Sequence, residues 1–316
     1  MTSSTNRPDT MLALRAQDRD GTLEVGEIPV PEPTIGDVLV RVAAASLVPT
    51  ELSWPSTWVD RSGMDRRPVI PGHEVSGTVV ALGYGTTGFG IGDEVFGLTD
   101  WYRDGSLAEF VAVEARNLAT KPGSLSHVDA AAFPMTALTA WQALFVHADL
   151  KAGQTVVIHG AGGGVGTLAV QLAVSAGARV IGTGRAEARD LVLHLGADQY
   201  LDLAHDALGE VKGVDVVFDL IGGDVLHRSS PMLRPGGSIV SIVEAPNDER
   251  ADVNHLLFVV EPNREQLTGL ARRIESLRPV VGNVGTLRDG PRLWAEKLAG
   301  GIPGKVVLTS ASPAVR

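Results

Sequence analysis

Five glycines lie within seven residues of the chain, from Gly160 to Gly166, in the stretch TVVIHGAGGGVGTLAVQLA. An apolar run precedes them, and a helical pattern of apolar residues follows. The spacing Ala161-x-Gly163-x-x-Gly166 matches the dinucleotide fingerprint, with alanine in its first position. Such a turn lets the backbone approach a diphosphate, and the helix that follows offers free N–H groups and a partial positive charge. We therefore predict a dinucleotide-binding loop formed by Ala161, Gly162, Gly163, Gly164, Val165 and Gly166. The alternative is a tight strand-to-helix turn that binds no ligand.

The end of the next apolar run, RVIGTG, indicates which dinucleotide is bound. An NAD site usually carries an acidic residue there, which accepts a hydrogen bond from the ribose 2′-hydroxyl. This chain has Thr183, Gly184 and Arg185 at that place, with no carboxylate among them. Arg185, with Arg189 four residues further on, could bind a 2′-phosphate through charge-assisted hydrogen bonds. We therefore predict NADP(H); the alternative is that both arginines are solvated residues at a helix start.

The composition excludes several other classes of site. The chain of 316 residues is long enough for two domains and contains no cysteine, so it has neither disulfides nor thiolate metal ligands. Its net charge of −10 and its lack of a basic run disfavour nucleic acid as a partner. No apolar run reaches the roughly 18 residues of a membrane span, and the polar N-terminus lacks an apolar signal segment. We expect a cytoplasmic protein with a small-molecule substrate and no membrane partner.

The elements that position the glycine loop change in type near residue 121. Before it, short alternating or apolar runs such as DVLVRVAAASL and VSGTVVALG are separated by Gly, Pro and Asp, which predicts a β-rich domain. After it, apolar strands at residues 155–159, 179–184, 214–222 and 237–243 alternate with helical patterns at 165–176, 186–195 and 224–233. This alternation predicts an α/β domain with a parallel sheet buried on both faces.

Nine segments in order make the chain resemble the medium-chain dehydrogenase/reductase superfamily, in its zinc-independent quinone oxidoreductase (zeta-crystallin-like) branch. They are PGHEVSGTVVALG, GDEVFGL, GSLAEFV, AAAFPMTALTAWQAL, AGGGVG, LGAD, VFDLIGG, LRPGGSIVSI and GKVVL. The resemblance covers nearly the whole chain. It implies a Rossmann-type doubly wound parallel sheet at residues 122–271, inserted into a β-rich GroES-like catalytic domain at 1–121 and 272–316.

The resemblance also implies the rest of the cofactor site. It adds residues around the nicotinamide half to the glycine loop: Gly222, Ser241, Ile242, Val243, Phe258 and Val259. It further implies a homodimer joined through edge strands of two cofactor domains, for which GSIVSIVEA and LLFVVEP are the candidate segments.

Related alcohol dehydrogenases carry a catalytic zinc, and the resemblance shows what this chain lacks for one. Val48 stands where their first cysteine ligand would be, whereas His73 matches a ligand position. Zinc can bind histidine and carboxylates alone, and Glu51, Glu74 and Asp100 are near in sequence. We nevertheless expect no metal, with His73 as a hydrogen-bonding residue and Glu74 as a structural carboxylate.

Two aromatic-rich loops, ELSWPSTWVDRSG and LTDWYRDGS, are predicted to line the substrate pocket. The predicted lining is Thr50, Trp54, Trp58, Trp101 and Tyr102, although ordinary loop packing would explain each aromatic residue equally well. Thr50 and Tyr102 are the candidate catalytic residues. Thr50 could donate to the reacting oxygen or be a turn residue, and Tyr102 could supply a proton, as could water.

These features predict an NADPH-dependent, zinc-independent oxidoreductase that reduces quinones or α,β-unsaturated carbonyls. A conjugated acceptor spreads the developing charge over an enolate and so needs less stabilisation than a simple carbonyl. Two alternatives stay open: an alcohol or ketone dehydrogenase of the same superfamily, and a non-catalytic NADPH-binding sensor.

Overall fold

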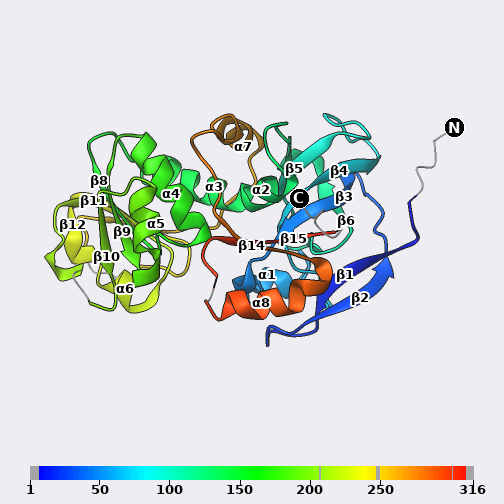
Figure 1. Ribbon diagram of the computed structural model, residues 1–316, viewed down its shortest axis with the longest axis horizontal. Coiled ribbons are helices and arrows are strands. Elements are labelled where there is room, and N and C mark those ends of the chain that lie inside the picture. The colour runs from blue at the N-terminus through cyan, green and yellow to red at the C-terminus, as the bar shows by residue number, and fades with distance from the viewer. Residues whose placement is uncertain (1–6, 206–207, 247–249, 301, 311–316) are drawn as a thin grey trace. The chain divides into compact units, whose positions relative to one another are not determined.

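The chain forms two compact units in a computed structural model that describes residues 7–205, 208–246, 250–300 and 302–310 (Figure 1). The first unit comprises Met1–Met135, Pro262–Ile274 and Val281–Arg316, and the second comprises Thr136–Glu261 and Glu275–Val280. These bounds differ from the predicted domain boundaries at residues 122 and 272. The difference arises because helix α2 (His127–Ala132) packs on strands of the first unit, as does α7 (Arg264–Ala271).

Six parallel strands build the second unit, in the order β10-β9-β8-β11-β12-β13. They are β8 (Thr155–His159), β9 (Arg179–Gly184), β10 (Gln199–Asp202), β11 (Val214–Asp219), β12 (Leu233–Ser241) and β13 (Asn254–Leu257). Val156, Val157 and Ile158 of β8 are fully buried, as expected for a strand covered on both faces. The strand order reverses between β8 and β11, which is where open α/β sheets bind their ligands.

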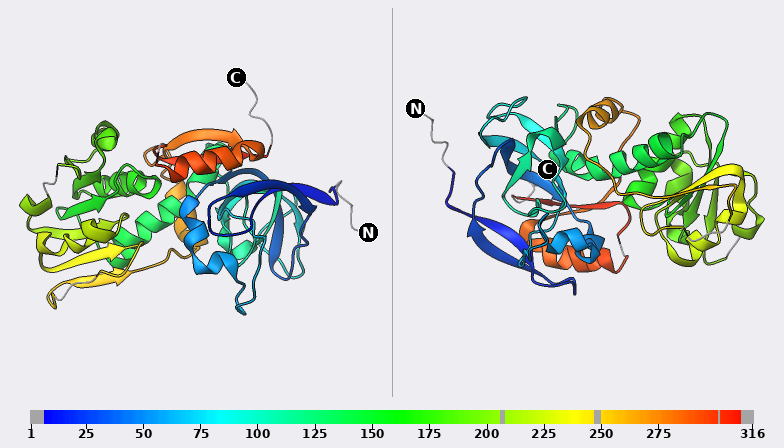
Figure 2. Two further views of the ribbon diagram at one scale, coloured as in Figure 1. Left: turned by 90° about the horizontal axis from the view of Figure 1, so that it is seen from below. Right: turned by 180° about the vertical axis from the view of Figure 1, so that it is seen from behind.

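Short helices connect these strands, drawn in green to yellow in Figures 1 and 2. They are α4 (Gly164–Ser175), α5 (Arg189–His194) and α6 (Gly223–His227), with 3-10 turns at Ala186–Ala188, Leu208–Glu210 and Ser230–Met232. Helix α4 packs on β8 and β9, and α5 packs on β10. The helix predicted for 224–233 is shorter than expected, because a separate turn containing Pro231 begins at Ser230 and β12 already begins at Leu233.

The first unit is built on a mostly antiparallel seven-stranded sheet and a separate hairpin. The hairpin is β1 (Thr10–Ala16) with β2 (Leu23–Pro29). The sheet has the order β14-β15-β3-β4-β5-β7, with β6 also paired to β3. Its strands are β3 (Asp37–Ser46), β4 (Glu74–Leu82), β5 (Glu94–Leu98), β6 (Phe110–Glu114), β7 (Leu118–Thr120), β14 (Val281–Thr286) and β15 (Lys305–Thr309). Because β15 pairs with β3, the end of the chain completes a sheet begun near its start.

Four helices and the start of a fifth belong to the same unit, with 3-10 turns at Pro49–Ser53, Ala115–Asn117 and Leu287–Asp289. They are α1 (Pro55–Trp58), α2, α7, α8 (Gly290–Leu298) and the first residues of α3 (Pro134–Trp141), which a π-helical turn at Gln142–His147 continues. The side chains of Ser126 and Asn263 accept backbone hydrogen bonds at the starts of α2 and α7. Trp294 of α8 is fully buried in the core. No helix within the described ranges is both long and apolar enough to cross a membrane.

Candidate active site

The glycine loop lies between β8 and α4, at the point where the strand order reverses. Gly163 is exposed at the start of α4, and no side chain among the described residues caps that N-terminus. The first N–H groups of the helix therefore lack intrahelical acceptors, which suits a diphosphate. Gly166 lies against the loop, and a Cβ there would come 2.3 Å from the Gly160 carbonyl oxygen. The loop and helix thus fit the diphosphate of a dinucleotide, with Gly166 required for their close packing.

A buried polar network joins the carboxyl ends of the central strands beside this loop. His159 of β8 lies 2.8 Å from Thr183 Oγ1 through Nδ1 and 2.8 Å from Ser229 Oγ through Nε2. Ser229 donates its own proton to the Val225 carbonyl, so it must accept from His159. Burial lowers the His159 pKa to about 4, which keeps the ring neutral. Thr183, predicted to bind cofactor, is itself fully buried, and its hydroxyl contacts His159.

A buried carboxylate, that of Asp219, shapes the turn after β11. The Asp219 carboxylate accepts the Gly222 N–H at 3.1 Å and the Ser241 hydroxyl at 2.8 Å. It thereby holds Gly222 in the left-handed region, at φ 76°. A Cβ on Gly222 would lie 2.8 Å from Val243 Cγ1, so the two predicted cofactor residues are in close contact. Ser241 is fully buried and acts through this network.

The predicted nicotinamide wall follows β13. Phe258 is buried, with its ring 4.7 Å from that of His147, whereas Val259 is 71% exposed. The π-helical turn holds the segment through Gln142, whose amide donates to the Glu261 carbonyl at 2.9 Å and accepts its N–H at 3.1 Å. Ile242 is half-buried and Val243 is 50% exposed. Exposed apolar side chains here leave a surface able to contact a flat ring.

The two arginines of the predicted 2′-phosphate site lie in the turn after β9. Arg185 and Arg189 are both exposed, with Arg185 preceding the 3-10 turn and Arg189 starting α5. Arg189 donates to the Tyr200 carbonyl at 3.3 Å. A Cβ on Gly162 would lie 2.3 Å from the Cβ of Ala188, so the glycine loop and this turn pack together. Both arginines therefore lie on a turn in contact with the diphosphate loop.

In the first unit, two of the predicted pocket tryptophans meet over His73. The Trp54 ring stacks on His73 with centroids 6.1 Å apart and planes at 16°, and Trp101 meets His73 edge-on at 4.8 Å. The two indoles are 5.8 Å apart and half-buried. Such a cluster offers an aromatic surface with defined geometry. Trp58 does not join it: its ring is in the core and its indole N–H donates to the Leu52 carbonyl, which corrects the prediction that it lines the pocket.

Beneath the tryptophans, Glu51 and His73 face one another in a fully buried site. Glu51 Oε1 accepts the Gly72 N–H at 2.7 Å, and His73 Nδ1 lies 2.8 Å from Thr99 Oγ1. The remaining atoms, Glu51 Oε2 and His73 Nε2, are 3.5 Å apart, and neither has a hydrogen-bond partner within the described residues. Burial raises the pKa of Glu51 to about 8 and lowers that of His73 to about 3. Both groups are therefore neutral at pH 7, with the proton on Glu51.

The donor set around His73 does not fit zinc. Zinc in proteins takes about four ligands. Among the described residues, no group of three or more His, Asp or Glu side chains could hold an ion. Asp100, a candidate by sequence, is instead paired with Arg61 and accepts the Tyr102 N–H at 2.7 Å. The described residues around His73 thus do not supply the ligands that a zinc ion takes.

The shifted pKa values of Glu51 and His73 make the free energy of unfolding depend on pH. Between the ordinary Glu pKa of 4.5 and the folded value of about 8, the folded chain keeps a proton that the unfolded chain releases, so the free energy of unfolding falls as pH rises. His73 has the opposite effect between pH 3 and 6.5, where the unfolded chain binds the proton. The loss from Glu51 is therefore unopposed from pH 6.5 to 8.

We predict that Glu51→Gln removes this loss, because its amide can accept from Gly72 and donate to His73 without ionising. The free energy of unfolding of the variant, relative to that of the unchanged protein, should therefore rise from pH 6.5 to 8, by at most about 1.4 kcal/mol per pH unit. Urea unfolding at several pH values measures the difference. If the free energies of unfolding of the two proteins change in parallel across this pH range, the raised pKa of Glu51 is contradicted.

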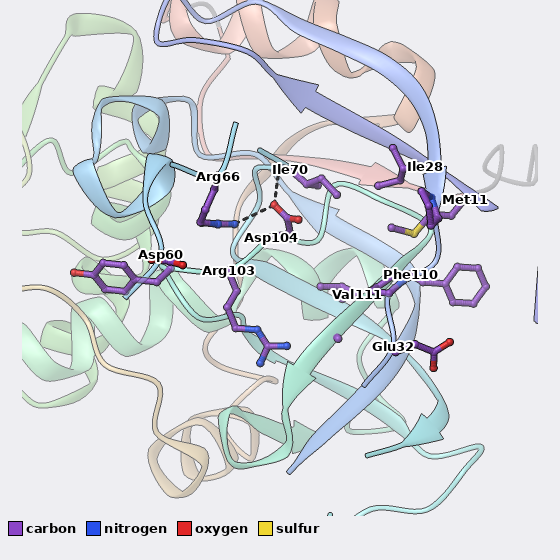
Figure 3. Close-up of a pocket in the computed structure, with 15 residues that line it drawn as sticks. Met11, Ile28, Glu32, Asp60, Arg66, Ile70, Arg103, Asp104, Phe110 and Val111 are labelled. Atoms are coloured by element: carbon purple, nitrogen blue, oxygen red, sulfur yellow. Dashed lines mark hydrogen bonds and ion pairs between the residues drawn. The ribbon is translucent and has the colours of Figure 1, made fainter. Parts of the chain in front are cut away.

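The two predicted catalytic residues, Thr50 and Tyr102, are not members of the ring cluster of Trp54, Trp101 and His73. Thr50 is exposed in the 3-10 turn that carries Glu51, and its carbonyl accepts from Ser53 Oγ at 2.6 Å. Tyr102 is half-buried, with Arg61 over its ring at 5.1 Å. Tyr102 lines a cavity of about 320 Å³ within the first unit. Figure 3 shows Met11 and Ile28 on one side of this cavity and Arg66, bonded to Asp104 at 3.0 Å, on the other.

A buried ion pair secures the strand that follows His73. The Glu74 carboxylate pairs with Lys305 of β15, accepts the Ser46 hydroxyl, and accepts the Met135 N–H at 2.9 Å. Both charged side chains are buried. Glu74 is thus a structural carboxylate, as the sequence predicted, and it ties β3, β4, β15 and α3 together.

Several residues of the candidate site could not be recognised in the sequence. The sequence presents Glu51 as a possible metal ligand and His159 and Asp219 as parts of strands, whereas the fold buries all three. Their signal is a polar residue at the end of an apolar strand, as in TVVIH and VDVVFD. That signal indicates that the polar residue has buried hydrogen-bond partners, but it does not identify those partners.

Two family models match the chain. Residues 34–123 match the alcohol dehydrogenase GroES-like domain, and residues 164–264 match the zinc-binding dehydrogenase family. The chain is 30% identical over 314 residues to a chloroplast envelope quinone oxidoreductase homolog of Arabidopsis thaliana, covering 90% of this chain and 93% of that protein. It is 33% identical over 270 residues to the NADPH-dependent alkenal/one oxidoreductase, chloroplastic, of the same plant, covering 80% and 66% respectively.

Solved structures of this family share the fold of the chain. The quinone oxidoreductase from Coxiella burnetii superposes with a TM-score of 0.88 at 28% identity, covering 96% of this chain and all of that one. The chain belongs to the medium-chain dehydrogenase/reductase superfamily. Within it, the relatives place this medium-chain reductase in the quinone oxidoreductase, zeta-crystallin-like branch. The predicted combination of a Rossmann sheet with a GroES-like domain is confirmed, and the chain is an oxidoreductase of a family that uses nicotinamide cofactors.

Proposed function

We propose that this medium-chain reductase uses NADPH, without zinc, to reduce quinones or α,β-unsaturated carbonyls. The observation that carries the proposal is the neutral, buried Glu51–His73 pair covered by Trp54 and Trp101. A site with this donor set offers an aromatic surface and no Lewis acid. Conjugated acceptors suit it, because their developing charge is delocalised over the enolate.

The chain's own residues would bind and orient the reactants. The loop from Ala161 to Gly166 would hold the diphosphate, and Arg185 would pair with the 2′-phosphate. Gly222, Ser241, Ile242, Val243, Phe258 and Val259 would support the nicotinamide half. A reduced nicotinamide, when bound, would supply a hydride to the β-carbon of the acceptor. Thr50 would donate a hydrogen bond to the reacting oxygen, and Tyr102 or water would supply the proton that completes the saturated product.

We also propose a homodimer and a cytoplasmic location. Strand β13 is one of the two edge strands of the six-stranded sheet. Its Leu257 is 44% exposed, and an open edge with apolar side chains needs cover. The other candidate segment, GSIVSIVEA, is not an edge, because β12 pairs with β11 and β13 on its two sides. Light scattering that gives the mass of one chain would contradict the dimer.

Steady-state assays with NADPH and NADH in parallel test the proposed function. We expect oxidation of NADPH by a benzoquinone and by a simple enone, with a lower KM than for NADH, in protein dialysed against a chelator. Turnover of a simple alcohol, lost on metal removal, would instead support an alcohol dehydrogenase. Binding of NADPH without turnover of any acceptor would support a sensor.

A further inference from the structure

A buried tyrosine, Tyr200, holds the turn that carries Arg185 through a hydrogen bond. Tyr200 of β10 is 3% exposed and pairs with Gly182 across the neighbouring strand β9. Its hydroxyl donates to the Arg185 carbonyl at 2.6 Å. Burial raises the Tyr200 pKa to about 12, so the hydroxyl stays protonated and remains a donor. The backbone of Arg185 is therefore fixed by a hydrogen bond in the sheet interior.

The same hydroxyl controls which residue can end β9. A Cβ placed on Gly184 would lie 2.7 Å from Tyr200 Oη, closer than side chains pack. Position 184 is one of the places where an NAD site would carry its acidic residue, at the end of this strand. With Tyr200 present, a side chain at 184 meets the hydroxyl, and glycine is the residue that fits.

Tyr200 also contacts the second arginine. The Arg189 guanidinium donates to the Tyr200 carbonyl at 3.3 Å. One residue of β10 thus bonds Arg185 through its side chain and Arg189 through its backbone. The two arginines are four residues apart in sequence, and Tyr200 gives them a common support.

We infer that Tyr200 is a specificity-determining positioning residue, which favours a 2′-phosphorylated dinucleotide by fixing Arg185 and by excluding an acidic side chain at position 184. The inference rests on the proposed use of NADPH. Tyr200 is 3% exposed and its hydroxyl is bonded to the Arg185 backbone, so its proposed effect on the cofactor passes through Arg185 and position 184.

The test is Tyr200→Phe, which keeps the ring and removes the hydroxyl. The loss of one positioning hydrogen bond should raise the KM for NADPH relative to that for NADH by about five- to tenfold, with little change in kcat. The matched control is Tyr84→Phe, a change at an 86% exposed tyrosine of the first unit, which should leave the ratio unaltered. A purely structural role for Tyr200 would lower thermal stability without changing the ratio, and that result would overturn the inference.

A second variant tests the steric part. Gly184→Asp should weaken binding of both cofactors in the unchanged background, because its Cβ meets Tyr200 Oη. Combined with Tyr200→Phe, it should bind NADH at least tenfold more tightly than Gly184→Asp alone. Equal affinities in the two backgrounds would overturn the inference. A natural-sequence protein that binds NADH as tightly as NADPH would overturn the proposed NADPH preference as well, so the two failures are distinguishable.

Discussion

Replacing Gly166 by alanine is expected to lower the affinity for the dinucleotide by about 10- to 100-fold, the loss of one hydrogen bond to a charged group. The added Cβ would lie 2.3 Å from the Gly160 carbonyl oxygen and 2.7 Å from Ala161 Cα. Both neighbours are backbone atoms of the loop, so no side chain can turn away. Helix α4 must then move off the loop, and its N–H groups lose their place beside the diphosphate.

Quenching of protein fluorescence by NADPH measures this affinity. Gly209→Ala is the matched control, because Gly209 belongs to the same unit and a Cβ there meets nothing within 4 Å. We expect the control to bind as the unchanged protein does. A Gly166→Ala protein that binds NADPH within twofold of the unchanged protein would show that the loop does not hold the diphosphate.

Replacing Lys305 by methionine is expected to destabilise the first unit by about 3–5 kcal/mol. The change leaves the Glu74 carboxylate buried and without its cation, and Glu74 is fully buried. Strand β15 would lose its tie to β4 next to His73. Urea unfolding followed by tryptophan fluorescence reports on this unit, since Trp54, Trp58, Trp101 and Trp294 belong to it.

Lys151→Met is the control for this prediction. Lys151 pairs with Asp149 at the surface, where the two side chains are 64% and 74% exposed, so its loss should cost about 1 kcal/mol or less. Adding Glu74→Gln to Lys305→Met should recover part of the stability, because the unpaired charge is then removed. Similar small losses at Lys305 and Lys151 would mean that the buried pair contributes little.

Local patterns were enough to predict the centre of the second unit. Apolar runs bounded by glycine predicted β8, β9 and β11, and the glycine spacing predicted the start of α4 within one residue. These features depend on neighbours along the chain. Strand β10 was missed because its sequence, QYLD, is short and half polar, and it becomes a strand only by pairing with β9.

The sequence predicts which loops form the candidate site, but it does not predict which side chains of those loops contact one another. The aromatic loops were identified, and Trp54 and Trp101 do meet, but nothing in the sequence distinguishes them from Trp58, which the fold buries. The Glu51–His73 pair joins residues 22 positions apart through the arrangement of a 3-10 turn and the residue before β4. Such pairings arise from tertiary packing, which determines burial and hence pKa.

The position of a transferred label tests the central claim most directly. Chelator-dialysed protein is incubated with NADPH carrying deuterium at the transferable C4 position and with a simple enone, and the product is analysed by NMR. We expect deuterium on the β-carbon of a saturated ketone, at an undiminished rate without metal. Deuterium on the carbonyl carbon of an allylic alcohol, or activity that returns only with added zinc, would contradict the account.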